Sequence, residues 1–89
     1  MINRQITIVN RLGLHARAAA KLVSCASGFQ SAVHLGLNGQ RVNGKSIMGV
    51  MMLAASQGST LEVEISGEDE TEALMALEGL INDRFGEDQ

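Results

Sequence analysis

His15 has the clearest chemical potential in this sequence, because it stands directly before an alanine-rich segment with helical spacing. Gly13 and Leu14 lead into it, so the imidazole would point at the open start of that helix. The first N–H groups of a helix have no partner within the helix, and with the helix dipole they favour an anion. The arrangement suits a histidine that accepts and releases a phosphoryl group.

Two neighbours of His15 would bind a phosphate carried by its ring. We expect the backbone N–H groups of Ala16 and Arg17 to donate to a phosphate on His15, and the Arg17 guanidinium matches phosphate oxygens. The positive end of the helix disfavours imidazolium, so a neutral ring is expected to attack. The alternative is that His15 merely begins the helix and that Arg17 is a solvated helical residue.

The first half of the chain predicts a strand, a helix and a hairpin. Alternation and β-branched residues mark the strands, and Gly28 is a plausible end for the helix. Asn-Gly is a strong signal for a two-residue hairpin turn. The predicted elements are a strand at Gln5–Val9, a helix from Ala16 to Gly28, a strand at Val33–Leu37, a turn at Asn38-Gly39 and a strand at Gln40–Asn43.

The second half predicts a short helix, a strand and a longer helix. Ser46 is placed as the N-cap of a helix over Ile47–Leu53, and Leu61–Ile65 alternates apolar and acidic residues. Asp69 followed by Glu72 resembles a capping box for the last helix, which we expect to stop near Gly86.

This order predicts an α+β fold, namely an open-faced two-layer sandwich. A four-stranded antiparallel sheet would be covered on one face by three helices, in the order βαββαβα. Glu62 and Glu64 require the other face to be solvated, and His34 is expected on that same face. Residues 1–89 are interpreted as a single domain.

Composition excludes several classes of function. The single cysteine, Cys25, cannot form a disulfide within the chain, and no cluster of ligands predicts a metal site or a cofactor. No apolar run approaches the roughly 20 residues needed to span a bilayer, and Met1–Gln5 lacks the apolar stretch of a signal peptide. With no Trp or Tyr and a net charge of −3, nucleic acid is not an expected partner. We expect a cytoplasmic monomer that does not insert into membranes.

Two motifs of this chain resemble those of the HPr family, the histidine-containing phosphocarrier proteins of the bacterial phosphoenolpyruvate-dependent phosphotransferase system. The first motif is Gly13-Leu14-His15-Ala16-Arg17, and the second is Lys45-Ser46-Ile47-Met48-Gly49-Val50-Met51. Their separation and the element order also match, and the resemblance runs from Gln5 to about Phe85.

The resemblance implies a phosphoryl carrier rather than an enzyme. Phosphorylated enzyme I would transfer its phosphoryl group to Nδ1 of His15, and an EIIA-type component of a sugar permease would receive it. Arg17 would accompany the histidine. Ser46 would be the serine that an HPr serine kinase/phosphorylase modifies in many bacteria, although a plain N-cap explains a serine there equally well.

Partner docking is expected at the short helix, because it cannot bury all of its apolar side chains. We expect docking by Ile47, Met48 and Met51, with Leu53 and either Val50 or Met52 packing inward.

Three alternative functions stay open. They are a carrier of the nitrogen-related branch, a purely regulatory HPr-like adaptor, and an enzyme that uses His15 as a base. Ala18 stands where many family members have proline, which leaves the rigidity of the loop and the branch of the system undecided.

Overall fold

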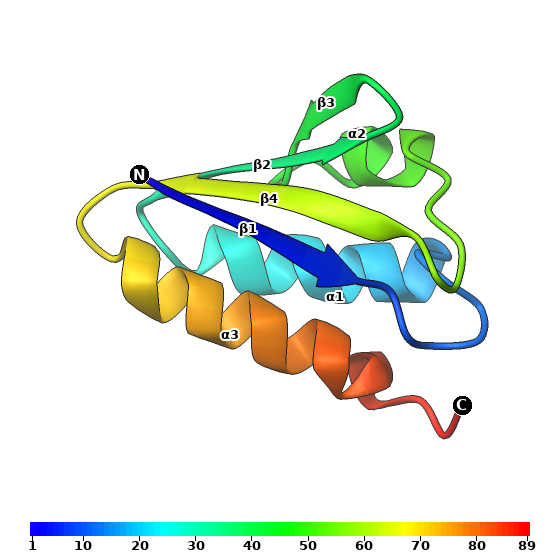
Figure 1. Cartoon of the computed structure of the whole chain (residues 1–89). Helices are drawn as coiled ribbons and strands as arrows, with labels where there is room; N and C mark the ends of the chain where they lie inside the picture. The colour runs from blue at the N-terminus through cyan, green and yellow to red at the C-terminus, as the bar shows by residue number, and fades with distance from the viewer.

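A computed structural model describes residues 1–89 and has a helical layer packed on one face of a four-stranded antiparallel sheet (Figure 1). The strand order is β1-β4-β2-β3, so the first strand lies beside the last. The strands are β1 Ile2–Thr7, β2 Ala32–Leu37, β3 Gln40–Asn43 and β4 Thr60–Ser66. The helices are α1 Ala16–Ser27, α2 Ile47–Met52, α3 Glu70–Asn82 and the short 3₁₀ helix η1 Arg84–Gly86. The predicted open-faced α+β sandwich is confirmed.

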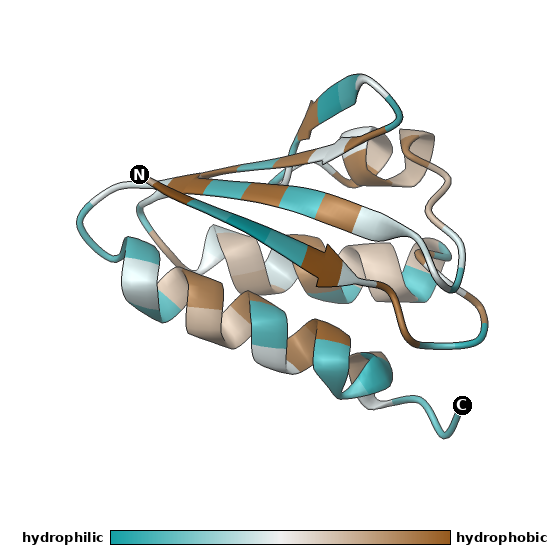
Figure 2. Cartoon of the chain, viewed as in Figure 1, coloured by the Kyte–Doolittle hydropathy of each residue, from teal (hydrophilic) through white to brown (hydrophobic).

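Strand β4 separates the core from the solvated face of the sheet. Its residues Leu61, Val63 and Ile65 are at most 1% exposed, and the polar residues between them point to the other face. Figure 2 shows this alternation as brown and teal bands along the strand. His34 lies opposite Glu64 in the pairing of β2 with β4 and is half-buried, on the open face as expected.

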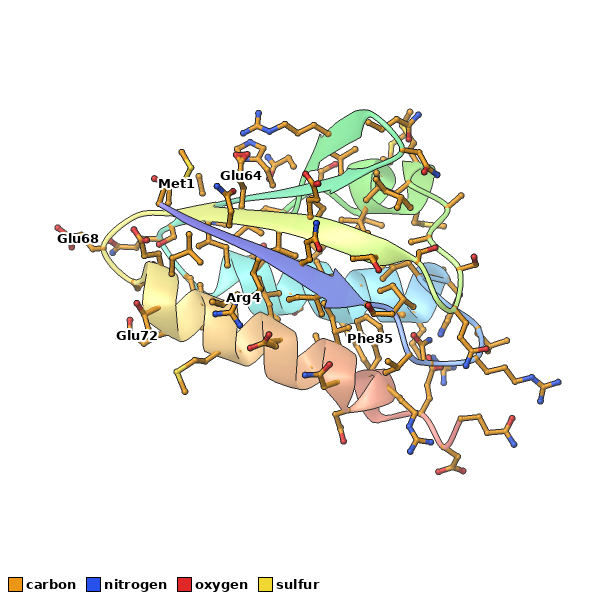
Figure 3. The ribbon with its side chains drawn as sticks, in the orientation of Figure 1. Met1, Arg4, Glu64, Glu68, Glu72 and Phe85 are labelled. Atoms are coloured by element: carbon orange, nitrogen blue, oxygen red, sulfur yellow. The ribbon has the colours of Figure 1, made fainter.

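Strand β1 begins earlier in the chain than its alternation indicated. It starts at Ile2 rather than Gln5, because Ile2 pairs with Ile65 at the far end of β4. Arg4 on this strand reaches α3 and forms an ion pair with Glu78 at 3.2 Å (Figure 3). Tertiary pairing therefore extends a strand whose local sequence is polar.

Helix α1 follows its prediction closely. It runs from Ala16 to Ser27 and is capped by Gly28, and it turns Ala18, Ala19, Leu22 and Ala26 into the core. These four side chains are fully buried among 20 buried apolar residues. Burying one Leu side chain contributes about 1.5–3 kcal/mol, so the buried face fixes the rotation of α1 about its axis. That rotation leaves Arg17 exposed.

The last helix ends before the expected position. Helix α3 stops at Asn82, and Arg84 and Phe85 take positive φ values of 58° and 55°. This turn carries Phe85 between the end of α3 and the sheet (Figure 3), where it is fully buried. Burial of the aromatic ring offsets the cost of a left-handed backbone, which local helical periodicity cannot anticipate.

Asp69 does not form the predicted capping box. It is the N-cap of α3, yet its side chain makes no capping hydrogen bond. Its carboxylate instead accepts hydrogen bonds from the backbone N–H groups of Gln30 and Ser31, at 2.8 and 2.9 Å, and from the Ser31 hydroxyl. The Ser31 hydroxyl is the main cause of the lowered pKa of Asp69. The side chain therefore ties α3 to the loop before β2.

No helix in the molecule has both the length and the apolar character needed to cross a bilayer.

Candidate functional site

His15 is the N-cap residue of α1, with an extended backbone (φ −69°, ψ 175°). Its carbonyl accepts the hydrogen bond from Ala19 N–H at 2.8 Å, and its imidazole makes no capping bond. The N–H groups of Ala16, Arg17 and Ala18 precede that first helical hydrogen bond, so the helix offers them no partner. The site thus combines a half-buried imidazole with donors suited to an anion.

Gly13 makes the tight turn that delivers His15 to this position. Its φ is +67°, and a Cβ atom there would lie 2.5 Å from the carbonyl oxygen of Ala55. The next residue, Leu14, donates its N–H to the same carbonyl at 2.9 Å and is buried. Glycine is required at position 13 for two reasons. A Cβ atom would collide with the backbone of the loop after α2, and a positive φ value disfavours residues with a side chain.

Arg17 and His15 line the same shallow hollow at the start of α1, together with Arg11 and Glu87. Arg17 takes part in none of the four ion pairs of the structure. Its guanidinium is therefore free to meet a phosphate brought to His15.

Glu87 is a neighbour of His15 that the sequence did not reveal. One carboxylate oxygen, Oε2, forms a hydrogen bond with Nε2 of His15, and the other, Oε1, accepts from the Asn10 side-chain amide at 3.0 Å. These contacts lower the pKa of Glu87, the hydrogen bond with His15 most and that with Asn10 next. The two residues are separated by 72 positions and no short motif contains both, so no local signal predicts the pair.

The residues after α3 bring Glu87 back to the loop before α1. The Lys21 ammonium donates to the carbonyl of Phe85 at 2.6 Å, and Arg11 N–H donates to the carbonyl of Gln89 at 3.0 Å. We name residues 84–89 the C-terminal strap. It lies along one side of the His15 hollow.

Ser46 is confirmed as the N-cap of α2. Its hydroxyl oxygen accepts from Gly49 N–H at 3.1 Å. The neighbouring Lys45 donates to the carbonyl of Phe29 at 2.7 Å, so its ammonium already has a partner.

Helix α2 presents an apolar surface to solvent. Val50 and Leu53 pack into the core, which leaves four large exposed side chains: Ile47, Met48, Met51 and Met52. Met52 is 66% exposed, so of the two candidates for inward packing it is Val50 that accompanies Leu53. Helix α2 contacts α1 and lies at the end of the molecule where α1 begins (Figure 1).

Comparisons with known proteins agree with this geometry. Residues 2–83 match the family model described as PTS HPr component phosphorylation site. The chain is 58% identical over 87 residues to the phosphocarrier protein HPr of Cupriavidus necator, covering 98% of both proteins. It is 45% identical to the crystal structure of HPr-C-His from Thermoanaerobacter tengcongensis, with a TM-score of 0.96 and all of both chains covered. A structure described as an HPr dimer from the same organism is 46% identical, with a TM-score of 0.79, covering 98% of this chain and 100% of that one.

A match of this length, with helices and sheet in the same arrangement, identifies the family and its general role. The role is that of a phosphocarrier and not of a catalytic enzyme. This chain belongs to the HPr family of phosphocarrier proteins of the phosphotransferase system.

Proposed function

We propose that this protein accepts a phosphoryl group from phosphorylated enzyme I on Nδ1 of His15 and passes it to a histidine of an EIIA-type component. One observation supports Nδ1, rather than Nε2, as the nitrogen that is phosphorylated. Nε2 of His15 is engaged by Glu87, so Nδ1 is the ring nitrogen left for the incoming phosphorus. The open start of α1 next to the ring supplies donors for the phosphate oxygens.

The transfer exchanges one bond to phosphorus for another. The lone pair of Nδ1 forms the new N–P bond while the bond from phosphorus to its donor atom on enzyme I breaks, and that bond's electron pair stays with the donor atom. The phosphate gains hydrogen bonds from the backbone N–H groups of Ala16 and Arg17 and from the Arg17 guanidinium.

Docking by Ile47, Met48 and Met51 would bring partners to the same end of the molecule. These side chains are 46%, 76% and 43% exposed, and Met52 adds to the surface. Flexible methionine side chains adapt to different partner surfaces, which suits a protein that must meet both a donor and an acceptor.

Ser46 would be the regulatory site, phosphorylated by an HPr serine kinase/phosphorylase. A phosphate there lies at the start of α2 and keeps an acceptor near Gly49 N–H, so the helix would stay folded. It would add about −2 charges beside the docking residues and repel an acidic partner surface.

The protein would act in the cytoplasm, with sugar transport as the destination of the phosphoryl group, and as a monomer. Sedimentation velocity distinguishes it from a dimer like that described for a relative.

Phosphoenolpyruvate and enzyme I provide the direct test. We expect acid-labile phosphate on His15 of the protein and none on the variant His15→Ala, with an EIIA-type acceptor removing the label. A protein that stays unlabelled, or a label that survives in His15→Ala, would contradict the proposal. Comparing sugar-branch and nitrogen-branch acceptors then decides which branch is served.

A further inference from the structure

We propose that Glu87 is a positioning residue for His15: its carboxylate, held by Asn10, keeps the proton on Nε2 and stabilises the ring while Nδ1 carries the phosphoryl group. The proposal rests on the proposed phosphorylation of His15. It assigns a role to the C-terminal strap, which lies outside both motifs.

Both carboxylate oxygens of Glu87 have a partner at the site. Oε2 contacts Nε2 of His15, and Oε1 accepts from Asn10 Nδ2 at 3.0 Å. The Glu87 side chain is only 19% exposed and that of His15 28%, so water is partly excluded from the contact. Such a contact is stronger than one on an open surface.

Asn10 is oriented to hold this carboxylate. It is fully buried, and its Nδ2 donates both to Glu87 and to the carbonyl of Gly13, the latter at 2.8 Å. Turning the amide over would set Oδ1 against two oxygens. In the observed orientation Oδ1 is buried without a partner. Leaving a buried acceptor unsatisfied is costly, which indicates that this side chain is retained for its donors.

The fold places Glu87 by several contacts that do not involve His15. Phe85 is fully buried, Lys21 binds the carbonyl of Phe85, and Arg11 binds the backbone carbonyl and the side chain of Gln89. These contacts anchor the C-terminal strap on both sides of Glu87. The carboxylate is therefore preorganised at Nε2 before any phosphate arrives.

The chemistry explains why a carboxylate is useful there. When the Nδ1 lone pair forms the N–P bond, a ring that keeps its Nε2 proton becomes cationic. When the N–P bond breaks, the electron pair returns to Nδ1, and the ring leaves as neutral imidazole only if Nε2 still carries that proton. The Glu87 carboxylate accepts the Nε2–H hydrogen bond and stabilises the cationic ring in both directions.

Other charged groups also face the hollow. They are Arg11 from the loop before α1, Arg17 from α1 and Asp88 beside Glu87. Lys21 contributes to the lowered pKa of Glu87, after the hydrogen bonds with His15 and Asn10. Only Glu87 touches the His15 ring among the ion pairs and hydrogen bonds of the structure.

The test replaces Glu87 by its uncharged analogue. Glu87→Gln keeps the size of the side chain and removes the charge, and Asp83→Asn is the control because it removes an exposed charge at the end of α3. Each protein is phosphorylated with phosphoenolpyruvate and enzyme I. The phosphohistidine is then titrated by ³¹P NMR, and its transfer to an EIIA-type acceptor is timed by rapid quench.

For Glu87→Gln we expect the phosphohistidine titration midpoint to fall by about one pH unit and transfer near neutral pH to slow about tenfold. Asp83→Asn should leave both unchanged. Equal midpoints and rates in the original protein and Glu87→Gln would overturn the proposal, as would an equal effect of Asp83→Asn. Failure of the original protein to be phosphorylated would instead refute the function of His15, so the two failures are distinguishable.

Discussion

Arg17 is exposed on the first turn of α1, and its guanidinium has no partner among the ion pairs of the resting protein. In the proposed transfer, this unpaired arginine beside a half-buried histidine would gain a partner when phosphate reaches His15. The same residue contributes little to folding, because no core contact depends on its head group. Its role is therefore testable by substitution without loss of the fold.

Replacing Arg17 by alanine is predicted to slow phosphoryl transfer about tenfold to a hundredfold. The basis is the loss of charged hydrogen bonds worth about 1.5–3 kcal/mol. Quenched-flow assays with enzyme I measure the rate, and circular dichroism checks that the fold is retained. Arg41→Ala is the matched control, since Arg41 pairs with Glu64 on the open face of the sheet. If Arg17→Ala accepted the phosphoryl group at the normal rate, Arg17 would be only a solvated helical residue with no role in transfer.

At the scale of the elements, the start of α1 depends on the turn before it. Gly13 approaches the carbonyl of Ala55 so closely that the loop after α2 and the loop before α1 fix each other. Ala18 fits the same picture, because it lies in the first turn of α1 and is fully buried there. Packing and the Gly13 turn hold the loop in its place.

Gly13→Ala is predicted to lower the free energy of unfolding by about 1–3 kcal/mol through backbone strain and to slow phosphorylation by displacing His15. Gly79→Ala in α3 is the matched control. Nothing lies within 4 Å of its added Cβ, and alanine should stabilise the helix by about 0.5–1 kcal/mol. Urea unfolding and the enzyme I assay report the two effects. Equal stabilities for the two variants would remove the requirement for glycine at position 13.

Ser46→Asp is predicted to keep α2 folded, since aspartate is also a good N-cap, and to slow phosphorylation of His15 about two- to fivefold by surface repulsion. Ser46→Asn is the neutral control that also caps the helix. Raising the salt concentration should shrink the difference between the two variants. If Ser46→Asp is phosphorylated as fast as Ser46→Asn at low salt, charge at this position does not act as a brake.

Elements with strong local signals were predictable from the sequence, and elements set by distant contacts were not. The Asn38-Gly39 turn takes positive φ values of 52° and 81°, which the residue types demand, and Ser46 caps α2 as expected. In contrast, the beginning of β1 depends on pairing with β4, and the side chain of Asp69 turns to a loop 38 residues earlier in the chain. Such contacts leave no periodic trace in a single sequence.

Across the whole molecule, the His15 site joins two distant parts of the chain. His15 and Arg17 were predicted from their place at the start of a helix and the second motif from its resemblance to the HPr family, but Glu87 lies 72 residues from His15. It reaches the site only because Phe85 is drawn into the core and the backbone reverses there. Part of the resting site is thus produced by tertiary packing.

The pH dependence of stability should report this connection. The pKa of Glu87 is lowered in the folded protein, so its carboxylate stabilises the fold above the ordinary glutamate pKa of about 4.3, and this contribution is lost as the pH falls through the folded pKa. The original protein should therefore be more stable than Glu87→Gln near neutral pH, and the difference should close below about pH 4. Urea unfolding across that pH range measures it. A gap that persists in acid would mean that the carboxylate charge is not its source.

The position of β1 beside β4 has a consequence for how the protein is made. During synthesis the first strand emerges long before its partner, because Ile2 must wait for Ile65 and Thr7 for Thr60. Its backbone donors and acceptors on that side stay unpaired until most of the chain has left the ribosome. The edge of the sheet that was translated first therefore cannot close until β4 has been made, and a nascent chain contains His15 well before it has the strand that completes the sheet.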